Sequence, residues 1–437
     1  MKHPIVILGG GLAGLTAARY LRSHQVPFRL FEAGPKLAGL AQSFHDKDGF
    51  TYDFGAHFIT TRLAAAVGYS ANCRNVPRYG ESVWLRHKVA RYPFGLLAQP
   101  RYMLSALASK FKGLLNRHPA TNVADWFREA YGDNLAREIA IPLTEAWSGL
   151  PGNELSPAVG NKMTSGILRT IMLRMAGSWT KRTVAVGYAT TLQESPHVWH
   201  VYPNGGLGAM LGHMARDVMD SVQTSSPVQK IYVEQERVVG VRVNEQDIPC
   251  STVISTAPVH VLPKLVSGTT TLDDLAQFKY RAMIFVNLRL NGRGLLPDVV
   301  LWTPEKHLPY FRLTETPLSM PWSAPEGSTL LTVDIGSKVG DGHWTMSDDE
   351  LGNYCVDHLQ ELIPDIRSRY RGCRVLRTPL AYPIYSLEYE QRRQQFAQSS
   401  GIDGLHSVGR NGEFAHILME DVYWRTRRKL QQVVQHQ

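Results

Sequence analysis

The stretch VILGGGLAGLTAARYL, residues 6–21, places three glycines between an apolar run and a helical pattern. Residues 4–8 are mostly β-branched and apolar, which is typical of a short buried strand. Gly9-x-Gly11-x-x-Gly14, between a strand and a helix, is the dinucleotide-binding fingerprint in its required context. Gly9 permits the tight turn, Gly11 lets the backbone approach a pyrophosphate, and Gly14 allows close helix packing. We therefore predict a pyrophosphate site at the N-terminus of the following helix.

A second predicted strand, residues 28–31, ends in an acidic residue that fits the same motif. Glu32 stands near the distance of about 20 residues past the last glycine at which a carboxylate binds the adenosine ribose. After Glu32 the parallel pattern stops, and it resumes only near Val253 and His406. A nicotinamide dehydrogenase usually completes its nucleotide domain contiguously, so this interrupted order favours FAD over NAD.

Composition limits the remaining classes. A chain of 437 residues predicts two or three domains, and a formal charge of +9 suits an anionic ligand. The 4 cysteines have no metal or redox spacing, so we expect reduced thiols in a cytoplasmic protein without a signal peptide. No apolar stretch reaches the roughly 20 residues that span a membrane. No nucleic-acid motif accompanies the basic run at residues 425–429. The sequence leaves open whether the protein forms a homodimer.

Residues 96–117 form a basic amphipathic stretch with two interpretations. Its apolar residues either pack against another part of the protein or make a peripheral contact with a membrane. These residues are Met103, Leu104, Leu107, Phe111, Leu114 and Leu115.

The order of predicted elements indicates an α/β fold with two interleaved domains, because no linker or repeat separates the segments. Residues 1–95, 200–260 and 400–437 are expected to form a discontinuous, Rossmann-like FAD-binding domain. Residues 96–199 and 261–399 are expected to form a substrate domain with a mixed β-sheet and a helical cap.

Several segments resemble the FAD flavoproteins that include amine oxidases, protoporphyrinogen oxidases and UDP-galactopyranose mutases. The resemblance covers nearly the whole chain and implies FAD as the cofactor. Besides the fingerprint, it rests on FEAGPKLAGLAQSFHDKDGFTYDFGAHF at residues 31–58, YPNGGLGAML at 202–211, VISTAP at 253–258 and VGRNGEFAHILMEDV at 408–422. The fingerprint and the last segment together are specific, whereas the middle ones are weak individually.

The resemblance also implies roles in FAD binding. Glu32 would bind the ribose, Val228 would meet the adenine through its backbone, and Met419 would begin a helix aimed at the flavin O2. A helix N-terminus there stabilises the negative charge of a reduced flavin. Ala38 replaces a family glycine, which permits FAD only if its φ is negative. The full cofactor set is Gly9, Gly11, Leu12, Ala13, Gly14, Glu32, Ala33, Gly39, Leu40, Ala41, Gly55, Ala56, His57, Val228, Gly409, Arg410, Met419, Glu420 and Asp421.

His57, Arg281 and Tyr385 are the candidate catalytic residues. His57, in a glycine-flanked loop expected over the flavin, would serve as an acid, a base or a hydrogen-bond donor. Arg281 matches a diphosphate-binding arginine of the mutases, and Tyr385 either walls the pocket or packs in the core. The candidate substrate contacts are Trp147, Arg281, Tyr382, Arg410 and His416. No metal cluster or Ser-His-Asp elbow appears, so the cofactor would carry the chemistry.

Within this group the chain looks most like the mutases that interconvert pyranose and furanose sugar nucleotides, yet it departs from them on the substrate side. Thr60 stands where they have a second histidine, and Pro142 where they have a uridine-stacking tyrosine. Glu145 and Ala146 replace a lysine and a glutamine. We therefore favour an FAD-dependent oxidoreductase that takes a hydride from an anionic or sugar-like small molecule. A non-redox mutase and a non-catalytic FAD-binding protein remain the alternatives.

Overall fold

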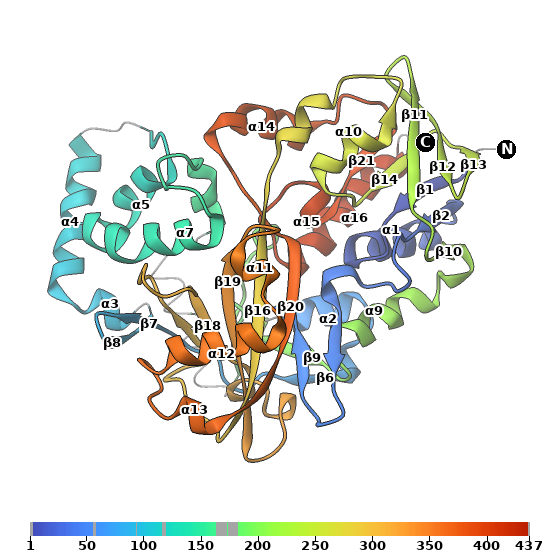
Figure 1. Ribbon diagram of the computed structural model, residues 1–437. Coiled ribbons are helices and arrows are strands. Elements are labelled where there is room, and N and C mark those ends of the chain that lie inside the picture. The colour runs from blue at the N-terminus through green and yellow to red at the C-terminus, as the bar shows by residue number, and fades with distance from the viewer. Residues whose placement is uncertain are drawn as a thin grey trace.

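The computed structural model describes residues 3–55, 58–92, 94–115, 119–162 and 182–435, together with Leu173. Figure 1 shows a nucleotide-binding half around α1 and α16, a second sheet with long strands beside it, and a helical cap at the far end. The fold is α/β, as the sequence predicts.

A five-stranded parallel sheet carries the glycine turn, in the order β10-β2-β1-β14-β21. Its strands come from distant parts of the chain, and the parallel pattern resumes in β14 and β21, as the sequence predicts. Their side chains are mostly apolar and buried, which a parallel sheet covered on both faces requires. The strands are β1 (Ile5–Leu8), β2 (Phe28–Phe31), β10 (Val222–Gln223), β14 (Val253–Ser255) and β21 (Leu405–Ser407).

Helices α1 (Leu12–Ser23), α9 (Leu207–Arg216) and α16 (Met419–Gln435) share one apolar core with this sheet. The inner face of α1 packs into this core, because Leu15 and Leu21 are fully buried. The final helix begins at Met419, as predicted. This packing holds the N-termini of α1 and α16 at the same edge of the sheet (Figure 1).

A seven-stranded mixed sheet forms the second half, in the order β20-β16-β19-β18-β17-β7-β8. Its strands are β7 (Glu81–Leu85), β8 (Lys88–Arg91), β16 (Tyr280–Asn291), β17 (Val300–Trp302), β18 (Arg312–Glu315), β19 (Ser328–Ser337) and β20 (Tyr370–Pro383). The expected boundary at residue 95 differs from this pairing, since β7 is hydrogen-bonded to β17 and belongs to the second sheet. Period-two patterns alone do not say which sheet a short strand joins.

The cap is helical, and the remaining elements are short. The cap contains α3 (Phe94–Leu97), α4 (Pro100–Leu115), α5 (Val123–Tyr131), α6 (Asp133–Leu135), a π-turn at Ala136–Ala140 and α7 (Ile141–Ser148). The other helices are α2 (Thr61–Ala66), α10 (Leu262–Leu265), α11 (Gly342–Thr345), α12 (Asp348–Leu359), α13 (Ile366–Arg369), α14 (Glu390–Gln398) and α15 (Gly409–Gly412). The other strands are β3 (Ser43–His45), β4 (Thr51–Asp53), β5 (Ile59–Thr60), β6 (Cys73–Asn75), β9 (His200–Pro203), β11 (Val228–Glu234), β12 (Arg237–Val243), β13 (Gln246–Pro249) and β15 (Val266–Ser267).

Candidate active site

A groove of about 350 Å³ runs from the glycine turn to the seven-stranded sheet. It lies where the carboxyl ends of the parallel strands meet the start of α16, the usual ligand position in such sheets. The groove brings together these predicted site residues: Gly9, Gly11, Leu12, Ala13, Glu32, Gly39, Leu40, Ala41, Tyr382, Gly409, Arg410 and Met419.

The three fingerprint glycines occupy different surroundings. Gly9 has a φ of +97°, and a Cβ there would lie 2.0 Å from the Thr256 hydroxyl. A Cβ on Gly14 would lie 1.8 Å from the Gly9 carbonyl oxygen, so this glycine packs the helix onto the turn. A Cβ on Gly11 would have the Ala38 carbonyl oxygen, at 3.9 Å, as its nearest neighbour. Open space at Gly11, with the N-terminus of α1 behind it, fits a pyrophosphate.

Glu32 lines the groove, and its contact with the adenosine ribose stays a prediction. Its two carboxylate oxygens accept the backbone N–H groups of Gly10 and Gly34, each at 2.7 Å. These bonds fix the carboxylate and leave lone pairs for a ribose hydroxyl. The Ser226 N–H donates to the Glu32 carbonyl at 2.9 Å, which brings the chain leading into β11 beside this residue. Val228, the first residue of β11, does not itself line the groove.

Ala38 adopts the conformation that we expected FAD binding to exclude. Its φ is +95°, so the expectation of a negative value is wrong. The Ala38 N–H donates to the Gly10 carbonyl at 3.0 Å and holds the loop against the fingerprint. Gly39 follows at φ +53°, where its Cβ position lies 3.7 Å from the Gly11 Cα. The left-handed alanine costs about 1–2 kcal/mol, and the surrounding contacts hold it in place.

Two segments of the resemblance, residues 31–58 and 202–211, meet in one hydrogen-bond network beside the groove. Asp53 accepts bonds from the Ser43 hydroxyl at 2.6 Å and the Tyr202 hydroxyl at 2.7 Å. Ser43 in turn accepts the Leu207 N–H at 2.8 Å, at the start of α9. Burial raises the pKa of Asp53 to about 6, although both hydroxyls favour its charged form. The network ties β3 and β4 to α9, next to the groove.

We expect Asp53 to make stability depend on pH. The unfolded chain releases this proton near pH 4, whereas the folded protein holds it up to about pH 6. Stability should therefore fall by about 2–3 kcal/mol as the pH rises through this window. Urea denaturation at several pH values measures the slope, and Asp53→Asn should remove the part of it that Asp53 contributes. An unchanged slope in this variant would assign the effect to another group.

A buried ion pair that was not predicted from the sequence lies at the far end of the groove. Arg312, on β18, lines the groove and pairs with Asp334 on β19, whose side chain is fully buried. Burial lowers the pKa of Arg312, but the Asp334 carboxylate outweighs it and raises this pKa above its usual value. A Cβ on Gly55 would lie 3.1 Å from an Arg312 nitrogen, which places the pair behind the loop expected near the flavin. The signal in the sequence is an aspartate inside the apolar strand TLLTVDIG.

Arg281 and Arg410 present desolvated guanidinium groups, and the Asp341 carboxylate attracts Arg281 only from beyond ion-pair distance. Arg410 donates to the Ala381 carbonyl at 2.7 Å and lies 5.0 Å from the centre of the Tyr382 ring. Arg281 packs against Gly149, whose Cβ position lies 2.5 Å from its Nη1. Burial lowers the pKa of both groups. Among the described residues neither forms an ion pair, and both Nε atoms are buried without a hydrogen-bond partner.

The candidate aromatic residues form a stack behind the groove. The His416 ring lies 5.2 Å from Tyr382, nearly parallel to it, and 4.8 Å from Trp147. Tyr382 lines the groove, while Trp147 and His416 back it. The Tyr385 hydroxyl accepts the His416 N–H at 2.8 Å, and its ring packs under Arg393. This places Tyr385 as a support for the His416 loop, away from the groove lining.

At the start of α16, Met419 lines the groove but the two acids face elsewhere. The Asp421 carboxylate accepts the N–H groups of Thr190 and Thr191 at 2.8–3.0 Å. Glu420 pairs with Arg62 at 2.5 Å. Both acids are buried and anchor the helix, so the groove receives the backbone end of α16 rather than their charges.

Two central candidates, Ala56 and His57, lie outside the described residues. The role of His57 stays a prediction. Gly55 just before them has a φ of +87°, and Thr60 just after them caps α2 by accepting the Leu63 N–H at 3.0 Å. The residue that replaces the second mutase histidine is therefore engaged in a helix cap.

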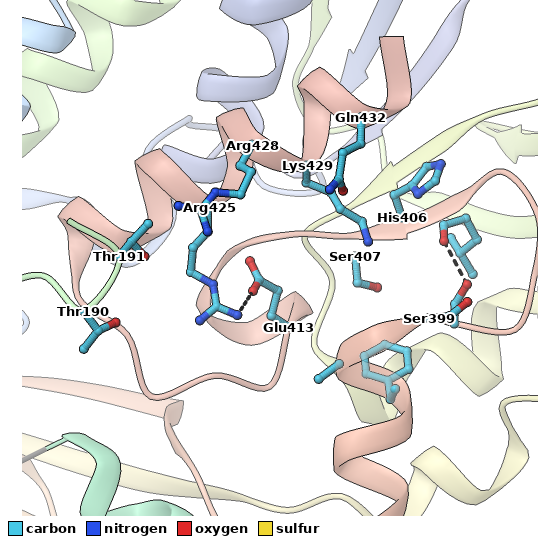
Figure 2. Close-up of a pocket in the computed structure, with 14 residues that line it drawn as sticks. Thr190, Thr191, Ser399, His406, Ser407, Glu413, Arg425, Arg428, Lys429 and Gln432 are labelled. Atoms are coloured by element: carbon cyan, nitrogen blue, oxygen red, sulfur yellow. Dashed lines mark hydrogen bonds and ion pairs between the residues drawn. The ribbon is translucent and has the colours of Figure 1, made fainter. Parts of the chain in front are cut away.

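A second cavity, of about 530 Å³, lies between β21, α14 and α16. Figure 2 shows Arg425 and Lys429 projecting into it from α16, with Arg425 paired to Glu413. None of the predicted cofactor or substrate residues lines it. Glu413 also accepts the Gly409 N–H at 3.1 Å, so the turn at α15 separates this cavity from the groove.

Two kinds of feature are absent from the described part of the chain. No group of three or more His, Cys, Asp or Glu side chains there could hold a metal ion. No helix in the same residues combines the length and apolar character needed to cross a membrane.

Comparisons with known proteins agree with this geometry. In structure the chain is similar to reduced UDP-galactopyranose mutase, with a TM-score of 0.79 at 17% identity, covering 100% of this chain and 95% of that one. A putative protoporphyrinogen oxidase from Exiguobacterium sp. 255-15 matches with a TM-score of 0.74 at 17% identity, over 100% of both chains. Putrescine oxidase bound to putrescine matches with a TM-score of 0.69 at 14% identity, over 99% of both. The family model described as flavin containing amine oxidoreductase matches residues 12–423. The chain therefore belongs to the family of flavin-containing amine oxidoreductases, with FAD as its cofactor.

Proposed function

We propose that this flavoenzyme dehydrogenates an anionic or sugar-like small molecule. The observation that carries the proposal is the pair of desolvated guanidinium groups of Arg281 and Arg410, neither of which forms an ion pair among the described residues; Asp341 attracts Arg281 only at longer range. A buried cation without a counter-ion is costly, and a bound carboxylate or phosphate would offset that cost. Arg410 reaches the groove directly, and Arg281 pairs with Tyr382 in the β16–β20 register.

The chain's own residues then bind and orient the substrate. Arg281 and Arg410 would hold its anionic group, while the Tyr382 ring, backed by Trp147 and His416, fixes the plane of the bound molecule. The charge of Arg312 at the groove wall would favour an electron-rich group near it. When bound, FAD supplies a hydride acceptor. A base must take the substrate's proton, and His57 is the predicted candidate.

The alternative is a non-redox sugar-nucleotide mutase, which would use the same two arginines to hold a diphosphate. The helix-capping role of Thr60 argues against it, because its hydroxyl is occupied by the Leu63 N–H. Glu145 points the same way, since it accepts the Gly152 N–H at 3.0 Å and pairs with Lys306.

The experiment is an anaerobic titration of the holoenzyme with sugar phosphates, nucleotide sugars, carboxylates and amines. We expect the flavin absorbance near ~450 nm to bleach with a member of an anionic class. Bleaching by a cationic amine alone would overturn the anionic assignment. Turnover of a nucleotide sugar only after dithionite reduction, without net flavin oxidation, would establish the mutase instead.

Arg281→Ala should weaken substrate binding without loss of FAD. Removing one charge-assisted contact costs about 1.5–3 kcal/mol, which corresponds to a rise in KM of roughly 10–100-fold. Steady-state kinetics and the flavin-to-protein absorbance ratio measure the two effects. Arg237→Ala is the matched control, because that arginine is exposed and distant from the groove. Loss of FAD from Arg281→Ala would place this residue in the cofactor site.

A further inference from the structure

Helix α4 packs onto the cap with its small and polar side chains. The Ser105 hydroxyl accepts the Asn134 N–H at 3.1 Å, and the Tyr102 hydroxyl donates to Glu138 at 2.8 Å. A Cβ on Gly132 would lie 2.6 Å from the Ala106 nitrogen, so the helix backbone touches the turn before α6 directly. This close backbone contact leaves little room beside Gly132, and among the described side chains of α4 the one large buried residue is Tyr102.

The large apolar side chains of α4 instead face solvent. Met103, Leu104, Leu107 and Phe111 are exposed by 49%, 63%, 50% and 67%. Their spacing puts them on one arc of the helix. The apolar side of this amphipathic helix therefore faces solvent, whereas the apolar arc of an ordinary packing helix faces the core. Such a contiguous exposed apolar surface indicates an interaction site.

Charge borders this arc. Lys110 and Lys112 are exposed; at 100° per residue Lys110 lies about 20° outside one edge of the apolar arc, and Lys112 lies about 80° beyond the other edge. Residues 100–115 contain no acidic residue. The neighbouring strand β8 adds exposed Lys88 and Arg91. Figure 1 shows α4 and β8 at the same outer margin of the cap, away from the nucleotide-binding half.

We propose that the exposed arc of α4 binds the surface of a membrane that contains anionic phospholipids. An apolar stripe bordered by lysines is the pattern of a helix lying in the interface, with its apolar side chains among the acyl chains and its lysines at the headgroups. A second copy of the chain fits less well. In a symmetric contact Lys110 and Lys112 would meet their own copies with no acid on the helix to pair with them.

The test is co-sedimentation of the holoenzyme with vesicles. Vesicles of phosphatidylcholine and phosphatidylglycerol should bind the protein at low salt, and phosphatidylcholine alone should bind it much less. The double variant Leu104→Ser/Phe111→Ser should lower binding to the mixed vesicles by about tenfold or more. Lys110→Gln/Lys112→Gln should lower it by about fivefold for each lysine, since each contributes about 1 kcal/mol near an anionic surface.

Val339→Ser is the matched control, because Val339 is also 62% exposed but lies on the loop between β19 and α11. It should leave vesicle binding unchanged, and all variants should keep wild-type flavin content, which shows that they fold. Absence of binding to the mixed vesicles would overturn the proposal. If vesicle binding is absent and analytical ultracentrifugation shows a dimer that Leu104→Ser/Phe111→Ser dissociates, the arc binds a second copy of the chain instead.

Discussion

Asp334→Ala should lower the free energy of unfolding by about 3–5 kcal/mol, the cost of breaking a buried ion pair from one side. Asp334 is fully buried, and its partner Arg312 would keep its charge at the groove wall without a counter-ion. Urea denaturation of the FAD-stripped protein measures this loss without a contribution from cofactor binding. The same variant should also have altered affinities for substrate and for FAD, because Arg312 lines the groove.

Two controls separate this effect from general damage. Asp247→Ala breaks an exposed pair with Arg242, and such pairs contribute about 1 kcal/mol or less. The double variant Asp334→Ala/Arg312→Met removes both charges and should recover most of the lost stability, because no charge is left unpaired. A loss below about 1 kcal/mol in Asp334→Ala would show that Arg312 is solvated in solution.

The nucleotide half was predictable because its motif fixes backbone geometry. The spacing of Gly9, Gly11 and Gly14 depends on local sterics, and the structure shows the tight turn at Gly9 and the close packing at Gly14 that the motif requires. Glu32 follows from the same motif. Ala38 was not predictable in this way, since the network of contacts around it overrides the preference of alanine for negative φ.

The substrate half was less predictable because its residues meet through long-range pairing. Arg312 and Asp334 lie on neighbouring antiparallel strands, and only the register of β18 with β19 brings them together. The sequence shows an aspartate in an apolar strand but does not show its partner. Tyr385 shows the opposite error. The sequence suggested it as a catalytic residue, but its hydroxyl accepts the His416 N–H and supports that loop.

Gly11→Val should abolish FAD retention while leaving the apo fold intact. Gly11 has extended backbone angles, φ −77° and ψ −171°, that valine adopts without strain. Its Cβ would meet no protein atom closer than 3.9 Å. The added side chain would instead fill the space through which the pyrophosphate approaches the backbone. We expect FAD affinity to fall by roughly 100-fold or more, a loss of about 2.7 kcal/mol, measured by flavin absorbance after dialysis.

Gly14→Ala is the decisive comparison, because it affects the same turn in the opposite way. Its Cβ would lie 1.8 Å from the Gly9 carbonyl oxygen, so the backbone of the turn must move, at a cost of about 1–3 kcal/mol. In FAD-stripped protein Gly14→Ala should therefore lower the Tm, whereas Gly11→Val should not. Adding FAD should raise the Tm of the wild type but not that of Gly11→Val, since a ligand stabilises only the state that binds it. If FAD raised the Tm of Gly11→Val as much as that of the wild type, the pyrophosphate would not pass over Gly11.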